Sequence, residues 1–147
     1  MDPHTAADTL RRTLAEKDVV IAEQDGRRVG YLRLERLWSR LPFIALITVD
    51  AVCRRRGVGR AMLAFLEDRL ARDGHAVIYS SSQSNEPEPQ RWHRHMGFSG
   101  CGRIRGINPD GSDEVFFRKA VGEAHDTRRG FRGRAERCRR AGAAAGR

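Results

Sequence analysis

Cysteines and long apolar runs are both scarce in this sequence, and each scarcity excludes classes of protein. The three cysteines, Cys53, Cys101 and Cys138, are an odd number at wide, irregular spacing. That pattern fits neither a zinc site nor a disulfide framework, so we expect reduced thiols, no metal site and a cytoplasmic location. No apolar run approaches the roughly 20 residues of a membrane-spanning helix, and the first residues lack the apolar segment of a secretory signal. We therefore expect no membrane association.

Acidic residues are scarce relative to basic ones, and the imbalance is uneven along the chain. The 147 residues carry 28 Lys and Arg against 19 Asp and Glu, a net charge of +9. Residues 122–147 hold 8 arginines against 3 acids and a single aromatic residue. Such a stretch cannot bury enough apolar surface to offset the entropy lost on ordering. We expect a globular domain over residues 1–121 and a disordered tail over residues 122–147, with a nucleic-acid-binding arm as the alternative role of the tail.

Hydrophobic periodicity predicts an alternation of helices and strands. We expect strands at 19–24, 29–38, 42–49, 76–82, 98–107 and 114–121, and helices at 7–18, from Gly59 to Asp73 and at 90–96. The strand 42–49 is almost wholly apolar, so it should be central and covered on both faces. This order predicts an α+β, or mixed α/β, fold with a mostly antiparallel sheet.

A glycine-arginine junction links the apolar strand 42–49 to the following helix. Its sequence RRRGVGR places three arginines before Gly57 and Gly59. Converging backbone N–H groups and the positive end of a new helix make such a turn an anion site, and glycine lets a phosphate approach the backbone. A tight turn with solvated arginines is the alternative.

Two common phosphate-binding motifs do not fit this junction. A P-loop needs Gly-Lys-Ser/Thr, whereas Arg60 and Ala61 follow Gly59. A dinucleotide-binding fingerprint needs a third glycine, and Met62 occupies that position. The junction therefore belongs to neither of these two motifs.

The wider segment VDAVCRRRGVGRAM resembles the acyl-CoA-binding motif of the GNAT superfamily of N-acetyltransferases. Val49, Arg54, Gly57 and Gly59 fit that motif at the right spacing, while Ala51 stands where proline is usual. Downstream, WHRHMGF (residues 92–98) resembles the second signature of the family, which ends in Gly-Phe. The resemblance covers residues 19–121 and implies a GNAT-like fold with a shortened N-terminus.

The resemblance implies acetyl-CoA as the co-substrate, bound without a metal. The cofactor would lie where the strand ending at Val49 splays from the strand 76–82. Backbone groups of the first strand would hold the pantetheine arm, and the glycine-arginine junction would cradle the pyrophosphate. The implied cofactor-binding residues are Ile47, Thr48, Val49, Arg54, Arg55, Arg56, Gly57, Val58, Gly59, Arg60 and Asn85.

The catalytic residues are implied by position in the second signature. Many family members have a tyrosine four residues before the Gly of Gly-Phe, which protonates the leaving thiolate, and His93 stands there in this chain. Histidine can transfer protons near neutral pH, so we predict His93 as the acid, with a packing role as the alternative. Glu86 occupies the spacing of a pantetheine-contacting asparagine, and Asn85 lies one residue earlier. We expect Glu86 to bind a cationic amine or to act as a base through water, with ordinary loop solubility as the alternative.

The sequence thus predicts an N-acetyltransferase that moves acetyl from acetyl-CoA to a primary amine by direct attack in a ternary complex. The acceptor would be a small molecule or a peptide, a homodimer is compatible with this interpretation, and we do not expect nucleic acid as a partner. Two alternatives from other classes are a non-catalytic acyl-CoA-binding or regulatory domain and a nucleic-acid binder that uses the basic tail.

Overall fold

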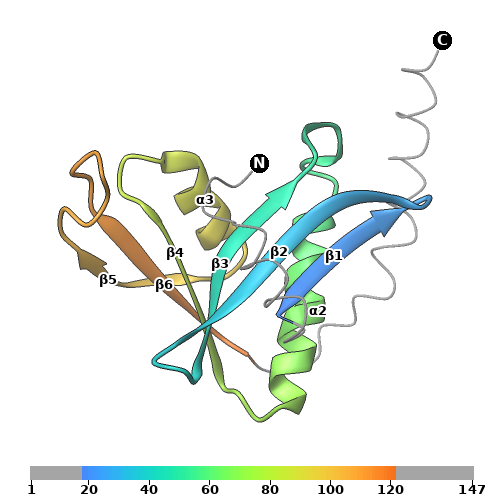
Figure 1. Ribbon diagram of the computed structural model, residues 1–147, viewed down its shortest axis with the longest axis horizontal. Helices are drawn as coiled ribbons and strands as arrows, with labels where there is room; N and C mark the ends of the chain where they lie inside the picture. The colour runs from blue at the N-terminus through green and yellow to red at the C-terminus, as the bar shows by residue number, and fades with distance from the viewer. Residues whose placement is uncertain (1–17, 122–147) are drawn as a thin grey trace. The chain divides into compact units, whose positions relative to one another are not determined.

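The computed structural model describes residues 18–121 of the chain (Figure 1). The predicted helix 7–18, apart from its last residue, and the predicted tail 122–147 lie outside the described residues. The elements, in chain order, are β1 (Val19–Gln24), β2 (Arg27–Leu37), β3 (Leu41–Val49), a short 3-10 helix η1 (Ala51–Cys53), α2 (Val58–Arg72), β4 (Val77–Gln83), α3 (Pro87–His95), β5 (Ser99–Ile104) and β6 (Glu114–Ala120).

The strands form a six-stranded sheet in the order β1-β2-β3-β4-β6-β5. The pairs β1–β2, β4–β6 and β5–β6 are antiparallel, whereas β3 and β4 are parallel, with Phe43 opposite Tyr79 and Ile44 opposite Ser80. Parallel neighbours need a crossover connection, and α2 provides it between β3 and β4. The prediction of an α+β fold with a mostly antiparallel sheet is confirmed.

The described chain divides into two compact units. The first contains residues 18–34 and 46–66, and in it β1 and β2 lie side by side as a hairpin (Figure 1). The two-residue turn between them consists of Asp25 and Gly26, both at positive φ (53° and 74°). Positive φ at both positions lets such a turn match the right-handed twist of the two strands. The core of this unit is formed by Val20, Val29, Leu32, Leu34, Cys53, Val58, Met62, Leu63 and Leu66.

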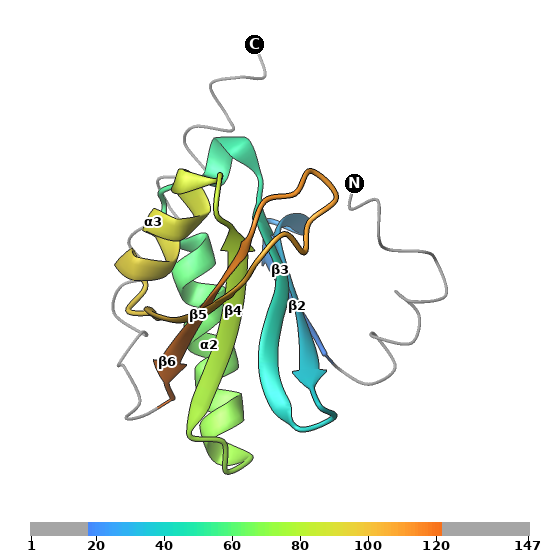
Figure 2. The ribbon, with the colours of Figure 1, turned by 90° about the vertical axis from the view of Figure 1, so that its left-hand side faces the viewer.

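The second unit contains residues 35–45 and 67–121. Here β4 buries alternate residues, among them Ser80, which contacts His93 of α3. Helix α3 therefore packs on the buried side of β4, and Figure 2 shows the two elements in side view. On β6, Phe117 is fully buried and stacks against His93 of α3. The core of this unit is formed by Ile44, Leu70, Ile78, Phe98, Phe117 and Val121.

Several predicted elements differ from the observed ones for identifiable reasons. Helix α3 begins at Pro87 rather than at residue 90, because proline lacks an N–H and suits the first helical position. Strand β3 is central in the sheet, as expected, with β2 on one side and β4 on the other. Only Pro42 and Ile44 are buried along it, so the prediction that both of its faces are covered was wrong. On α2 the buried residues are Val58, Met62, Leu63, Leu66 and Leu70, whereas the side chain of Phe65 is 55% exposed.

Candidate functional site

The junction after β3 has the backbone shape of an anion site. Strand β3 ends at Val49, η1 follows, and Arg55 and Gly57 then adopt positive φ (59° and 87°) before α2 begins. The first intrahelical bond runs from Ala61 N to Gly57 O, at 2.9 Å. The N–H groups of residues 58–60 precede that bond and carry the positive end of the helix dipole. The first turn of α2 contains no acidic residue that would oppose an anion.

Hydrogen bonds anchor the start of this junction to the neighbouring strand. Asp50 N donates to Val29 O at 2.9 Å, and Arg27 contacts the Asp50 carboxylate at 3.3 Å. The ion pair is exposed, so it contributes at most about 1 kcal/mol. Cys53 N donates to Asp50 O at 2.8 Å, and the Cys53 side chain is buried. These contacts hold η1 in place ahead of the glycines.

A close contact between β2 and α2 sets the position of the helix start. A Cβ added at Gly30 would lie 2.9 Å from Met62 Cε and 3.0 Å from Val58 Cγ1. Glycine at this strand position therefore lets the first two turns of α2 approach the strand. Both contacted side chains are buried, so this packing supports the junction directly.

The predicted cofactor residues of the junction lie together in the first unit. Arg54 Nε donates to Val49 O at 3.1 Å, which directs this arginine back along the loop. Arg54, Arg55 and Arg60 are exposed, and Arg56 is half-buried. Ile47, Thr48 and Val49 are the last residues of β3, with Thr48 exposed and the other two half-buried.

The other predicted residues, Asn85, Glu86 and His93, lie in the second unit. Glu86 immediately precedes α3 and is exposed, whereas His93 lies within α3 and is only 4% exposed. Asn85 is exposed, and its amide donates to Asp110 Oδ2 at 3.0 Å. Hydrogen bonds from Ser112, and then from Asn85, lower the pKa of Asp110.

His93 is enclosed by aromatic rings on the inner side of α3. Its imidazole stacks on Phe117 at 4.5 Å between ring centroids and 2° between planes. Trp92 and Phe98 contact it edge-on, at 5.2 and 5.4 Å. Burial lowers the pKa of His93, and this effect outweighs the Pro89 carbonyl and the charge of Glu114, which raise it.

The Gly-Phe signature has a structural reason in this fold. Gly97 adopts φ 92° after the last turn of α3, a conformation that favours glycine. Gly97 N donates to Arg94 O at 3.1 Å, and Phe98 N donates to His93 O at 2.9 Å, the bond pattern of a Schellman cap. The cap turns the chain so that Phe98 packs against the ring of His93.

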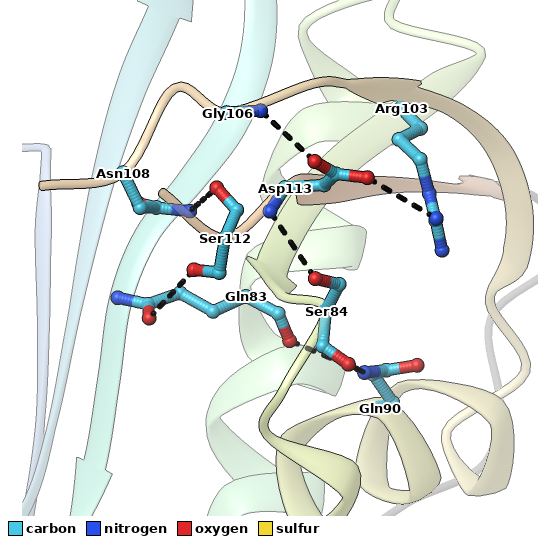
Figure 3. A network of polar contacts seen from close by, with 8 residues as sticks. All are labelled: Gln83, Ser84, Gln90, Arg103, Gly106, Asn108, Ser112 and Asp113. Carbon is cyan, nitrogen blue, oxygen red and sulfur yellow. Dashed lines mark hydrogen bonds and ion pairs between the residues drawn. The ribbon is translucent and has the colours of Figure 1, made fainter. Parts of the chain in front are cut away.

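A polar network joins the end of β4 to the loop between β5 and β6 (Figure 3). Asp113 is at its centre. Asp113 N donates to Ser84 Oγ at 3.2 Å, and the Asp113 carboxylate accepts from Gly106 N at 2.9 Å and from Arg103 at 3.2 Å. Gln90 of α3 donates to the carbonyl oxygens of Gln83 and Ser84, at 3.2 and 3.0 Å. The network therefore holds the segment that carries Asn85 and Glu86.

Sequence reasoning did not identify the partner of His93. Ser80 Oγ lies 2.7 Å from His93 Nε2, on the buried side of β4. The available signal was alternation, because Ser80 and Ser82 continue the buried period-2 series of Ile78. Within residues 18–121, no group of three or more His, Cys, Asp or Glu side chains is arranged to hold a metal ion. The same residues include no helix long and apolar enough to cross a membrane.

Comparison with protein families gives one match across most of the described chain. Residues 2–98 match the sequence model of the acetyltransferase (GNAT) family. The S-(2-succino)cysteine N-acetyltransferase of Bacillus subtilis is 25% identical over 92 residues, which cover 58% of this chain and 56% of that protein. The chain thus spans a little over half the length of this curated relative.

Solved structures with the same fold come from several organisms. Ard1 from Thermoplasma volcanium matches with a TM-score of 0.73 and 18% identity, over 84% of each chain. The ribosomal-protein-S18-alanine N-acetyltransferase from Escherichia coli matches with a TM-score of 0.61 and 20% identity, over 78% of this chain and 79% of that one. The protein yncA from Salmonella typhimurium, solved with its cofactor acetyl-CoA, matches with a TM-score of 0.68 and 20% identity, over 85% and 79%.

Proposed function

Because the chain belongs to the acetyltransferase (GNAT) family, we propose that it moves an acetyl group from acetyl-CoA to a primary amine by direct attack in a ternary complex. The observation that carries this proposal is the anion site between β3 and α2. Its paired positive-φ residues, Arg55 and Gly57, and the acid-free first turn of α2 suit the pyrophosphate of a coenzyme A ester.

The proposed cofactor contacts come from backbone groups and from arginine side chains. Backbone N–H groups of residues 57–60 would hold phosphate oxygens, and the exposed arginines Arg54, Arg55 and Arg60 would add charge-assisted contacts. Arg56 completes the basic run, and the β3 residues Ile47, Thr48 and Val49 would bind the pantetheine arm through backbone groups. For Asn85 we propose a supporting role, because its amide already donates to Asp110.

The acceptor is proposed to be a primary amine on a small molecule or a peptide. Two relatives support this class: one is named for S-(2-succino)cysteine and the other for the alanine of a ribosomal protein. Glu86 is exposed at the start of α3, where its carboxylate would attract a cationic amine or act on it through water. His93 is the proposed proton-transfer residue. A cytoplasmic location and a homodimer remain predictions.

A calorimetric titration with acetyl-CoA tests the anion site. Valine at position 57 places a branched side chain where φ is 87° and where phosphate must meet the backbone. We expect Gly57→Val to remove measurable binding. Gly74→Val is the matched control, because Gly74 has φ 86° and open space around it at the far end of α2. Both variants carry a similar backbone strain of about 1–3 kcal/mol. A loss of acetyl-CoA binding therefore supports the site only if Gly57→Val shows it and Gly74→Val does not. Parental affinity for acetyl-CoA in a folded Gly57→Val variant contradicts the site.

A further inference from the structure

The sheet of the second unit has a helix face and an opposite face. Ser80 of β4 and Phe117 of β6 are paired in the ladder, and both contact His93 of α3. Lys119 of β6 lies on the same side, where it pairs with Glu67 of α2 at 2.9 Å. Helix α3 and the last part of α2 therefore contact one side of the sheet.

A strip of three side chains, Glu114, Phe116 and Arg118 of β6, lies on the opposite face and is called the β6 strip below. These residues alternate with Phe117 and Lys119 along the strand, so they point away from the helix face. Their ladder partners share that face, because directly opposed residues of an antiparallel pair lie on the same side of the sheet. The partners are Gln83, Ser81 and Tyr79 on β4 and Ile104, Gly102 and Ser99 on β5.

The two ends of the β6 strip carry unlike charges that a ligand can contact. Asn108 donates to Glu114 Oε2 at 3.0 Å, and Glu114 Oε1 has no hydrogen-bond partner within residues 18–121. Arg118 is exposed, and its guanidinium has no ion-pair or hydrogen-bond partner among the same residues. A carboxylate at one end and a guanidinium at the other are complementary to a ligand that carries both an ammonium and a carboxylate.

The middle of the β6 strip is apolar and open. The ring of Phe116 lies 6.0 Å from that of Phe43, and both side chains are half-buried. Beside Phe116, a Cβ added at Gly102 would meet nothing within 4 Å, so the space next to the ring is open. Ile104, opposite Glu114, is 44% exposed. An apolar group of a ligand that covers this part of the strip is stabilised by its removal from water.

The separation of the charged ends determines how long the ligand must be. Glu114 and Arg118 are four residues apart on β6, which is about 13–14 Å along a strand. A free amino acid carries its ammonium and carboxylate on the same carbon atom, so it is too short to reach both ends. An extended peptide has the same rise and the same alternation as the strand. Its first, third and fifth residues therefore match the three positions of the strip.

We propose that the β6 strip binds an extended peptide with a free N-terminus, an apolar third residue and an acidic fifth residue. The N-terminal ammonium contacts Glu114, the third side chain covers Phe116, and the fifth carboxylate pairs with Arg118. All three residues belong to the second unit. The proposal concerns binding alone and does not depend on acetyl transfer, so its failure would leave the proposed function standing.

Titration of the ¹⁵N-labelled full-length protein with pentapeptides, followed by NMR, tests the proposal without acetyl-CoA. The reference peptide is Ala-Ser-Leu-Ser-Glu with an amidated C-terminus. Three changed peptides carry an N-terminal acetyl group, serine in place of leucine, or lysine in place of glutamate. We expect the reference peptide to shift the resonances of β4, β5 and β6, and each change to weaken binding by roughly 3-fold or more. These comparisons use the parent protein, so they do not depend on the folding of any variant.

A charge swap makes the test specific for Arg118. In Arg118→Glu the reference peptide should bind roughly 5-fold more weakly, because attraction becomes repulsion, and the lysine peptide should gain affinity. Arg91→Glu is the matched control: it changes the net charge equally, at an exposed arginine of α3. It should leave both affinities at the parental value. Glu114→Gln should weaken binding of the free-amine peptide and leave the acetylated peptide unchanged.

Several results would overturn the proposal. Without measurable binding of the reference peptide, the strip is not a peptide site. Equal losses in Arg118→Glu and Arg91→Glu would show an effect of net charge only. Shifts of the same resonances that follow protein concentration in the absence of peptide would show that a second copy occupies the face. A chain that binds the peptide as expected and does not bind acetyl-CoA overturns the proposed function and leaves this proposal standing.

Discussion

At the scale of single residues, His93 shows how burial decides what a titratable side chain can do. The imidazole is 4% exposed, stacked on Phe117, and bonded through both nitrogens to neutral groups. Removing it from water costs more for the charged form than for the neutral form, so the pKa of His93 is lowered. Because burial favours the neutral imidazole, the stability of the folded protein should depend on pH.

His93 should make the protein less stable at acidic pH. Its pKa in the folded protein lies below the unfolded value of about 6.5, so the unfolded chain binds the proton more readily. The neutral ring therefore contributes full stability above about pH 6.5, and this contribution is lost as pH falls toward the folded pKa. Urea unfolding of the parent and of His93→Gln at several pH values checks this: the free-energy gap between them should narrow below about pH 6.5.

The control for that measurement is His95→Gln, at an exposed histidine of the same helix. This variant should keep the parental pH dependence. A gap between the parent and His93→Gln that stays constant from neutral to acidic pH would show that His93 titrates alike in both states, contrary to its burial.

The site residues differ in how far they could be predicted from sequence. A turn at Gly57 and Gly59 was predictable because glycine between a strand and a helix favours a tight turn, and Gly57 does adopt positive φ. The position of His93 followed from its spacing to Gly-Phe. The bond between His93 and Ser80 was not predictable, because the two residues are 13 apart and meet only through the packing of α3 on β4.

At the scale of elements, the hairpin between β2 and β3 contains an identifiable strain. Its turn places Trp38 and Ser39 at positive φ (49° and 62°), and Arg40 N donates to Leu37 O at 3.1 Å. Side chains with a Cβ are disfavoured in this region by roughly 1–2 kcal/mol per residue. Glycine avoids that cost, although it loses more entropy on folding.

Ser39→Gly should therefore stabilise the protein by about 0.5–1 kcal/mol, measured as a higher midpoint in thermal unfolding. Arg40→Gly is the control in the same exposed turn, because Arg40 does not adopt positive φ and gains no relief. It should leave stability unchanged or lower it. A Ser39→Gly variant that melts at or below the parental temperature would mean that the turn is not strained.

Most strands could be predicted from the periodicity of their apolar residues and from the turn residues that flank them. β1 and the Asp25–Gly26 turn follow from an apolar run before Asp-Gly, and β6 begins at the predicted Glu114. The burial along β3 could not be read from composition, because an apolar strand is compatible with one covered face as well as two. The start of α3 was placed too late because its two prolines indicated a loop, although proline is favoured in the first helical turn.

At the scale of the whole chain, the basic segment after Val121 should be dispensable for stability and catalysis. Val121 itself belongs to the fold, since it is 8% exposed and its N–H donates to Ala76 O at 2.8 Å. A truncation after Val121 should change the free energy of unfolding by no more than about 0.5 kcal/mol, as is usual for changes away from packed features. Denaturant unfolding and turnover of the truncated chain check this, and a loss of more than about 1 kcal/mol would show that the segment contributes to the fold.

The central claim is that this chain transfers acetyl from acetyl-CoA to an amine. The most direct measurement incubates the full-length protein with acetyl-CoA and a panel of primary amines, both small molecules and peptides, and quantifies free thiol and N-acetylated product in the same samples. We expect thiol release that requires an amine and equals the amount of acetylated product. Binding of acetyl-CoA without transfer to any amine, or thiol release without an acetylated product, would contradict the account.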